Sequence, residues 1–171
     1  MFRAFSIFCV LMVLFPVPSF GAVGNGDAIP AELPGFETLK GERGAVLVFV
    51  RSVDWCPYCQ VQLLNLKDVG KDIEGAGYNV VIVSYDTAEK QKAFGDKYRF
   101  PYAMVSDPNS HIIKAFGILD ESYKGRDGIY GIPQPHVYIV SKDGFVQDVL
   151  AEDGYKVRPS AELILERVRG L

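Results

Sequence analysis

Two cysteines three residues apart carry the clearest chemical signal in the sequence. Cys56 and Cys59 lie in the stretch "VDWCPYCQ", with Trp55 directly before the pair and Pro57 and Tyr58 inside it. Such a pair can bind a metal ion, form a structural disulfide (a staple), or exchange electrons by cycling between dithiol and disulfide. A structural staple is the weakest interpretation, because a bridge between Cys56 and Cys59 closes almost no loop and adds little stability.

The residues around the pair predict a strand that leads into a helix. The run "AVLVFVR", residues 45–51, is typical of a strand covered on both faces, and Pro57 suits the first turn of a helix. Offsets of three and four then predict one inward helix face, formed by Cys59, Leu63, Leu66, Gly70 and Ile73. Cys59 is therefore expected on the buried face, and Cys56 just before the helix at its open N-terminal end.

This asymmetry predicts different roles for the two thiols. The free N–H groups and the dipole at a helix N-terminus favour the thiolate, which is the reactive form of cysteine. Cys56 is expected to be partly exposed and to act as the nucleophile, while Cys59 resolves the intermediate that forms. The negative charge of Asp54 should reduce the extent to which the helix N-terminus lowers the pKa of Cys56. Arg51 and Asp54 are otherwise expected to be solvated.

The rest of the chain alternates predicted strands and helices. Further strands are expected at residues 78–86 and 102–106 and in a hairpin over 136–151 that turns at Asp143–Gly144. Further helices are expected over 87–100, capped by Thr87, over 109–117, capped by Asn109 or Ser110, and from about 159 to 170, with Ala161, Ile164, Leu165 and Val168 on its apolar face. This order predicts an α/β fold, with a central mixed β-sheet flanked by helices and the cysteine pair at the carboxyl end of the first strand.

The N-terminal residues have the layout of a secretory signal peptide. Arg3 precedes an apolar run from Ala4 to Val17, which is shorter than the roughly 20 residues that cross a bilayer and is followed by small residues. We therefore expect a signal peptide over 1–22 that is cleaved, an N-terminal arm over 23–43 and one domain over 44–171, exported to the periplasm or otherwise secreted. An uncleaved membrane anchor is the alternative.

Composition narrows the classes of function. The 171 residues carry a net charge of −3, and no basic stripe indicates nucleic-acid binding. Cleavage of the signal segment removes Cys9 and leaves Cys56 and Cys59 alone, whereas a secreted disulfide scaffold would spread several cysteines along the chain.

The cysteine motif also carries a family resemblance. "WCPYC" after a buried strand resembles the active site of the thioredoxin superfamily, and residues 134–144, "QPHVYIVSKDG", are similar to a stretch of its periplasmic, TlpA-like group. The resemblance implies a thioredoxin-like fold, with Pro135 as a cis-proline opposite the cysteines and Pro133 as the competing candidate. It further implies that the backbone of Gln134 pairs with an extended substrate, and that the substrate-binding residues are Trp55, Pro57, Tyr58, Gln134 and Pro135.

Two features depart from a minimal thioredoxin. Val50 occupies the position at which thioredoxins carry a buried acid for proton transfer. The polar loop over 120–131 and the overall length look more like the redoxin branch that is shared with peroxiredoxins, the AhpC-TSA-related proteins.

These observations predict an exported thiol–disulfide oxidoreductase that acts on proteins. Cys56 is the expected nucleophile and Cys59 the resolving cysteine, exchanging electrons with thiols or disulfides of substrate proteins. The redox-active disulfide Cys56–Cys59 carries the electrons itself, so no organic cofactor and no metal is expected. A partner protein must reset the pair, and no nucleic acid is expected as a partner.

Two alternatives remain open. One is a peroxiredoxin-like thiol peroxidase, although peroxiredoxins carry a threonine three residues before the reactive cysteine and a proline seven before it, where this chain has Val53 and Phe49. The other is a metal-binding protein, for instance in copper delivery, in which His111 or His136 would complete the ligands. His111 is more simply explained as a surface or cap residue.

Overall fold

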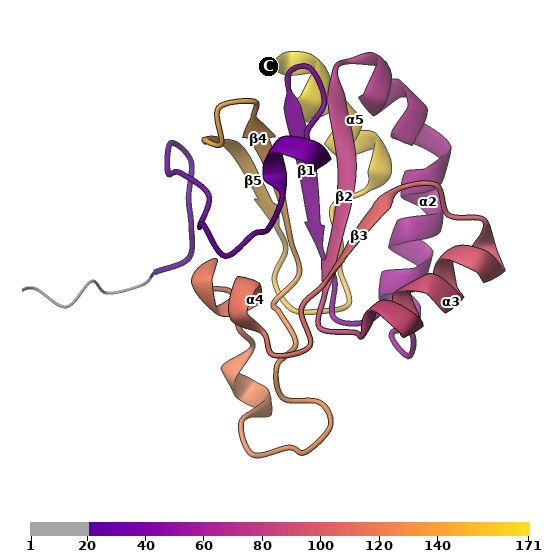
Figure 1. The fold of residues 1–171 in the computed structure, drawn as a ribbon, viewed down its shortest axis with the longest axis vertical. Coiled ribbons are helices and arrows are strands. Elements are labelled where there is room, and N and C mark those ends of the chain that lie inside the picture. The colour runs from indigo at the N-terminus through magenta and orange to yellow at the C-terminus, as the bar shows by residue number, and fades with distance from the viewer. Residues whose placement is uncertain (1–20) are drawn as a thin grey trace, which may run out of the picture.

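The structure, a computed structural model, describes residues 21–171 and places helices on both faces of one five-stranded sheet (Figure 1). The predicted signal peptide therefore lies almost entirely outside the described residues. The helices are α1 Phe36–Leu39, α2 Pro57–Gly75, α3 Ala88–Tyr98, α4 His111–Ala115 and α5 Ala161–Gly170, with a short 3₁₀ helix, η1, at Glu121–Tyr123. The strands are β1 Gly44–Phe49, β2 Tyr78–Ser84, β3 Ala103–Ser106, β4 His136–Ser141 and β5 Val146–Ala151.

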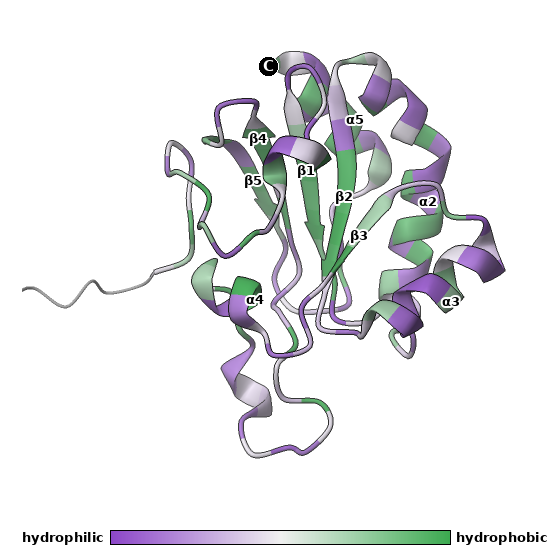
Figure 2. Cartoon of the chain, viewed as in Figure 1, coloured by the Kyte–Doolittle hydropathy of each residue, from purple (hydrophilic) through white to green (hydrophobic). Residues whose placement is uncertain are grey.

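Strand β1 lies at the centre of the sheet, whose strand order is β3-β2-β1-β4-β5. It pairs in parallel with β2 and antiparallel with β4; β3 extends the parallel side, and β5 forms the hairpin with β4. Every residue of β1 is buried, because both faces of the sheet are covered, and this explains its uninterrupted apolar sequence (Figure 2). The predicted mixed sheet, with its parallel strands first and its antiparallel hairpin last, is confirmed.

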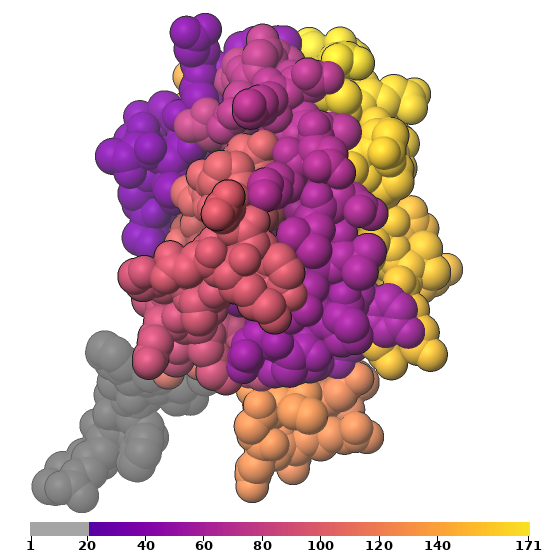
Figure 3. All heavy atoms as spheres, turned by 90° about the vertical axis from the view of Figure 1, so that its right-hand side faces the viewer, coloured from indigo at the N-terminus to yellow at the C-terminus, as the bar shows by residue number. Residues whose placement is uncertain are grey.

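The residues of β1 alternate between two apolar layers. Val46 and Val48 belong to the cluster that contains α2 and α5, whereas Leu47 and Phe49 belong to the cluster that contains α4. In the space-filling view, α2 and α3 cover the first of these faces, with α5 beside α2 (Figure 3). The predicted inward face of α2 is confirmed, because all five of its residues are buried: Cys59, Leu63, Leu66, Gly70 and Ile73. The predicted apolar face of α5 is buried in the same way.

The N-terminal arm is attached to the sheet. An isolated bridge joins Ala28 to Phe145, the side chain of Leu33 is buried, and α1 forms a single turn that the sequence analysis did not predict. The arm therefore contributes to the layer on the α4 side.

The N-terminus of α4 is capped differently from the prediction. Ser110 adopts a left-handed conformation with φ 57°, and its hydroxyl donates to the carbonyl of Gly131 at 2.7 Å. The carboxylate of Asp107 accepts hydrogen bonds from the N–H groups of His111 at 2.8 Å and Ile113 at 2.9 Å. Ser110, one of the two predicted candidates, is the N-cap residue of α4, but its side chain makes no capping hydrogen bond, because the Asp107 carboxylate already binds these free N–H groups.

Candidate active site

The cysteine pair lies at the end of the sheet where β1 runs into α2, and the structure shows it as a Cys56–Cys59 disulfide. Cys56 is the N-cap of α2, and its sulfur accepts a hydrogen bond from the backbone N–H of Cys59 at 3.3 Å. Pro57 begins the helix, as predicted, where its missing N–H costs nothing. The N-terminus of α2 is therefore directed at the Cys56 sulfur, which is the arrangement that favours a thiolate after reduction.

The disulfide is less accessible than the sequence indicated. Cys56 is only 2% exposed and Cys59 is fully buried, so the prediction of a partly exposed nucleophile was wrong for this oxidised state. The physical reason is the bond itself, because it draws the Cys56 sulfur toward a partner on the inward face of α2. Trp55, directly before the pair, and Tyr58, inside it, are each 41% exposed.

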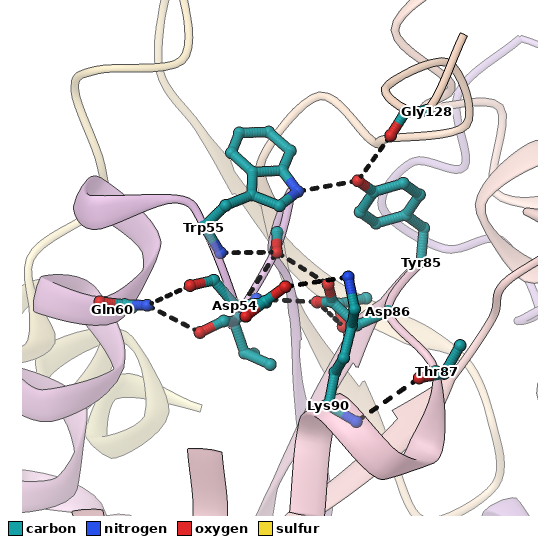
Figure 4. Close-up of polar contacts among 11 residues, drawn as sticks. Asp54, Trp55, Gln60, Tyr85, Asp86, Thr87, Lys90 and Gly128 are labelled. Atoms are coloured by element: carbon teal, nitrogen blue, oxygen red, sulfur yellow. Dashed lines mark hydrogen bonds and ion pairs between the residues drawn. The ribbon is translucent and has the colours of Figure 1, made fainter. Parts of the chain in front are cut away.

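A buried carboxylate organises the loop before Cys56 (Figure 4). Asp86, two residues after the end of β2, accepts hydrogen bonds from the hydroxyls of Ser52 at 2.7 Å and Ser84 at 2.8 Å and from the N–H of Val53 at 2.8 Å. The Ser52 hydroxyl in turn accepts from the N–H groups of Asp54 at 3.0 Å and Trp55 at 3.2 Å. Asp86 thus fixes the turn that places Cys56 at the N-terminus of α2.

Trp55 is held by its indole nitrogen. Its N–H donates to the Tyr85 hydroxyl at 2.8 Å, and this hydroxyl donates to the carbonyl of Gly128 at 3.2 Å (Figure 4). The polar loop over 120–131 protrudes from the same end of the molecule as the N-terminus of α2 (Figures 1 and 3). The loop is therefore connected to the residue that precedes the reactive cysteine.

The charge of Asp54 is compensated at the surface. Its carboxylate pairs with the ammonium group of Lys90 at 2.9 Å, and this contact raises the pKa of Lys90 above its usual value. Asp54 is solvated as predicted, and the ion pair offsets the negative charge that was expected to disfavour a Cys56 thiolate.

Arg51, in contrast, is not solvated as predicted but is buried, with 3% of its surface exposed. Its guanidinium lies 4.2 Å from the ring centroid of Tyr155, 4.7 Å from that of Tyr123 and 5.8 Å from that of Trp55. Aromatic faces attract a cation in this geometry, so three rings from separate segments hold the Arg51 charge inside the site. Its Nε atom is buried and has no hydrogen-bond partner among the described residues.

A second arginine contacts the cysteine pair directly. Arg158, two residues before the N-cap Ser160 of α5, directs its Nη2 at the Cys59 sulfur at 3.5 Å. Its Nε and Nη1 atoms are buried without a hydrogen-bond partner among the described residues. Burial, together with the charge of Arg51, lowers the pKa of Arg158 to about 10, which leaves it cationic at neutral pH.

The predicted residues at Gln134 and Pro135 line a neighbouring cavity of about 650 Å³, together with Tyr123 and Tyr155. Within residues 21–171 no peptide bond is cis, so the prediction of a cis-proline at Pro135 or Pro133 was wrong. The N–H of Gln134 donates to the carbonyl of Ile118 at 2.7 Å, and its carbonyl lies 3.0 Å from Nδ1 of His136. Both backbone groups that were expected to pair with a substrate strand are therefore engaged within the chain.

A metal site is not assembled in the part of the chain that the structure describes, because no three His, Cys, Asp or Glu side chains gather there in a way that would hold an ion. His136 stacks on Tyr138, and burial lowers its pKa. His111 lies at the first position of α4, where its N–H is bound by Asp107.

Sequence reasoning identified the cysteines and missed the three charged residues that surround them. Asp86 and Arg158 lie far from the motif in sequence, and no spacing pattern connects them to it. Arg51 did carry a signal, because it comes two residues after a strand that is buried on both faces.

The five-stranded sheet, the helix-capping cysteine and its inward partner define the class: this is a thioredoxin-fold redox enzyme that works through cysteine thiols. The model of the AhpC/TSA family matches residues 16–149. The chain therefore belongs to the AhpC/TSA family.

The sequence relatives are peroxiredoxins. A putative peroxiredoxin Bcp of Haemophilus influenzae is 26% identical over 140 residues, which cover 80% of this chain and 86% of the relative. Peroxiredoxin Bcp of Escherichia coli is 29% identical over 129 residues, covering 74% and 78%. The chloroplastic peroxiredoxin Q of Sedum lineare is 30% identical over 103 residues, covering 60% of this chain and about half, 52%, of the plant protein.

The solved structures agree on the fold. Peroxidoxin BcpB of Mycobacterium tuberculosis superposes with a TM-score of 0.72 at 21% identity, covering 87% of this chain and 98% of that protein. Reduced Prx3 of Vibrio vulnificus in complex with H₂O₂ gives 0.74 at 20% identity, covering 86% and 96%.

These relatives overturn one expectation. The prediction of an oxidoreductase that acts on the thiols and disulfides of substrate proteins was wrong, because the relatives that match most of the chain are peroxiredoxins. The engaged backbone of Gln134 agrees with this correction, because an extended protein substrate was expected to pair with it.

Proposed function

We infer that the protein is a thiol peroxidase that reduces hydroperoxides, with Cys56 as the peroxidatic cysteine and Cys59 as the resolving cysteine. The observation that carries the proposal is the position of Cys56 as N-cap of α2, in a chain that matches peroxiredoxins along most of its own length and of theirs. A helix N-terminus favours the thiolate that must attack the peroxide.

The reaction proceeds in two steps that balance. The Cys56 thiolate attacks the peroxide, its S–O bond forms as the O–O bond breaks, and the leaving alkoxide takes a proton to become the alcohol. This leaves a Cys56 sulfenic acid. The Cys59 thiolate then attacks the Cys56 sulfur, so that the S–S bond forms and hydroxide leaves to become water. One hydroperoxide is reduced by two electrons for each disulfide formed.

The positions that peroxiredoxins fill with threonine and proline are part of the core here. Val53 and Phe49 are both buried, and Phe49 packs against Phe116 with ring centroids 4.7 Å apart. The nearby Ser52 hydroxyl is already committed to Asp86. A hydroxyl that orients the peroxide is therefore missing at its usual place, and we expect slower turnover of hydrogen peroxide than in peroxiredoxins that carry the threonine.

The test is a titration of the reduced protein with hydroperoxide. Each equivalent of hydrogen peroxide or of a small organic hydroperoxide should convert one Cys56–Cys59 dithiol into one disulfide, measured as free thiol lost and as peroxide consumed. The same protein with both thiols alkylated is the control. Dithiols that survive an excess of every hydroperoxide tested would refute the proposal.

The Cys56–Cys59 disulfide must be reduced before another peroxide can react, and this step needs a partner. We propose that a thiol reductant returns the disulfide to the dithiol, and that the pair carries the electrons without an organic cofactor or a metal ion. The chemical basis is that thiol–disulfide exchange needs only a thiolate with access to one of the two sulfurs.

Export remains a separate proposal, which rests on the pattern of residues 1–22. The helices of residues 21–171 include none with the length and apolar character of a membrane span. Expression of the full chain in a bacterial host, followed by fractionation and mass measurement, should give a periplasmic protein that is shortened near residue 22. A full-length protein in the cytoplasmic fraction would contradict export.

A further inference from the structure

We propose that Arg158 holds Cys59 as a thiolate in the reduced protein, and thereby speeds the step in which Cys59 displaces hydroxide from the Cys56 sulfenic acid. The inference rests on the proposed peroxidase function and assigns a residue to its second step. It adds a charged group to a site in which the helix N-terminus acts on Cys56 alone.

The two sulfurs need different sources of stabilisation. Cys56 caps α2 and faces its free N–H groups, whereas Cys59 lies one turn inside the helix. Cys59 is fully buried in the apolar cluster that includes Leu63 and Ile164. Burial of this kind raises the pKa of a thiol, because the charged form loses its hydration. Without a counter-charge, Cys59 would stay protonated and would be a slow nucleophile.

Arg158 is in a position to supply that charge. Its Nη2 lies 3.5 Å from the Cys59 sulfur, and its other two guanidinium nitrogens are buried without a partner among the described residues. In residues 21–171 neither Arg158 nor Arg51 forms an ion pair with a carboxylate. The guanidinium of Arg158 is partly desolvated, and such a cation without an anion is costly; formation of a Cys59 thiolate on reduction would provide the anion.

The other charged groups around the pair leave this role to Arg158. Asp86, after β2, is engaged by Ser52, Ser84 and Val53, and Asp54 is paired with Lys90 at the surface. Burial lowers the pKa of His136, at the start of β4, so it is neutral at neutral pH. Arg51 adds positive charge from the end of β1, and it is held there by the rings of Trp55, Tyr123 and Tyr155.

The test isolates Cys59 from the peroxide chemistry. In a Cys56→Ser protein, the alkylation rate of Cys59 and the ultraviolet absorbance of its thiolate are followed against pH, with and without Arg158→Met. We expect Arg158→Met to move the titration of Cys59 to higher pH and to slow its alkylation at neutral pH by about threefold or more. This figure allows for the greater intrinsic nucleophilicity of a more basic thiolate, which offsets part of a tenfold loss of the ionised form.

Two further variants separate charge from packing. Arg158→Lys keeps the cation and should restore much of the effect. Lys156→Met removes an exposed cation, which lines a groove of about 640 Å³ together with Arg158, and should leave the titration of Cys59 unchanged. In the protein with both cysteines, Arg158→Met should prolong the life of the Cys56 sulfenic acid, detected with a sulfenic-acid-selective reagent after one equivalent of peroxide.

The outcomes distinguish this inference from the proposed function. An unchanged titration of Cys59 in folded Arg158→Met protein would overturn the inference, whether or not the protein reduces peroxides. A shifted titration in a protein that is inert to peroxides would uphold the contact between Arg158 and Cys59, and would overturn the peroxidase function instead.

Discussion

Replacement of Cys56 by serine is expected to abolish peroxide reduction, lowering turnover by at least about a thousandfold. The loss is this large because a serine hydroxyl does not ionise near neutral pH, so the group that attacks the O–O bond is gone. The side chain is buried and accepts one hydrogen bond, which a serine oxygen can also accept, so the fold should be retained. Peroxide consumption with a thiol reductant in excess measures the effect.

Cys59→Ser is the matched control for this change. It removes the second sulfur of the same helix turn and leaves the Cys56 thiolate in place. One equivalent of peroxide should still oxidise Cys56, so that a sulfenic acid accumulates and no intramolecular disulfide forms. Full activity in the Cys56→Ser protein, or complete inertness of Cys59→Ser toward peroxide, would reverse the assignment of the two roles.

Replacement of Asp86 by alanine is expected to lower the free energy of unfolding by about 3–5 kcal/mol. Asp86 accepts hydrogen bonds from two hydroxyls and one backbone N–H, all of them in the buried turn between β1 and α2 or at the end of β2. Each buried donor that loses its acceptor costs about 1–3 kcal/mol. Urea unfolding of the oxidised proteins measures the free energy directly.

The same change should also affect the chemistry. Without Asp86, the Ser52 hydroxyl is free to turn away from the N–H groups of Asp54 and Trp55. The turn that leads to Cys56 then loses the hydrogen bonds that fix it. We expect slower oxidation of Cys56 by peroxide even where the variant is folded. Asp96→Ala, which removes one partner of an exposed ion pair with Lys92, is the control and should cost less than about 0.5 kcal/mol. Equal losses in the two variants would show that Asp86 has no special role.

The family assignment illustrates a limit of local motifs. The stretch around Cys56 and Cys59 is short, and thioredoxin-fold enzymes of different function share such a stretch because all of them need a helix N-terminus at a thiol. Val53 and Phe49 were also local evidence, because they stand where peroxiredoxins carry a threonine and a proline, and they argued against a peroxidase. Similarity along most of the chain places it in the AhpC/TSA family beside peroxiredoxins, although these two positions lack the threonine and the proline.

The sequence by itself determined the sheet, the helix that begins at Pro57 and the unequal positions of the two cysteines. These features follow from periodicity, because residues three and four apart share a helix face and a strand buried on both sides must be apolar throughout. Only the tertiary structure brought Asp86, Arg51 and Arg158 to the cysteine pair and paired the backbone of Gln134. Such contacts depend on how distant segments pack, and a single buried charge leaves no repeating pattern in the chain from which its partner can be read.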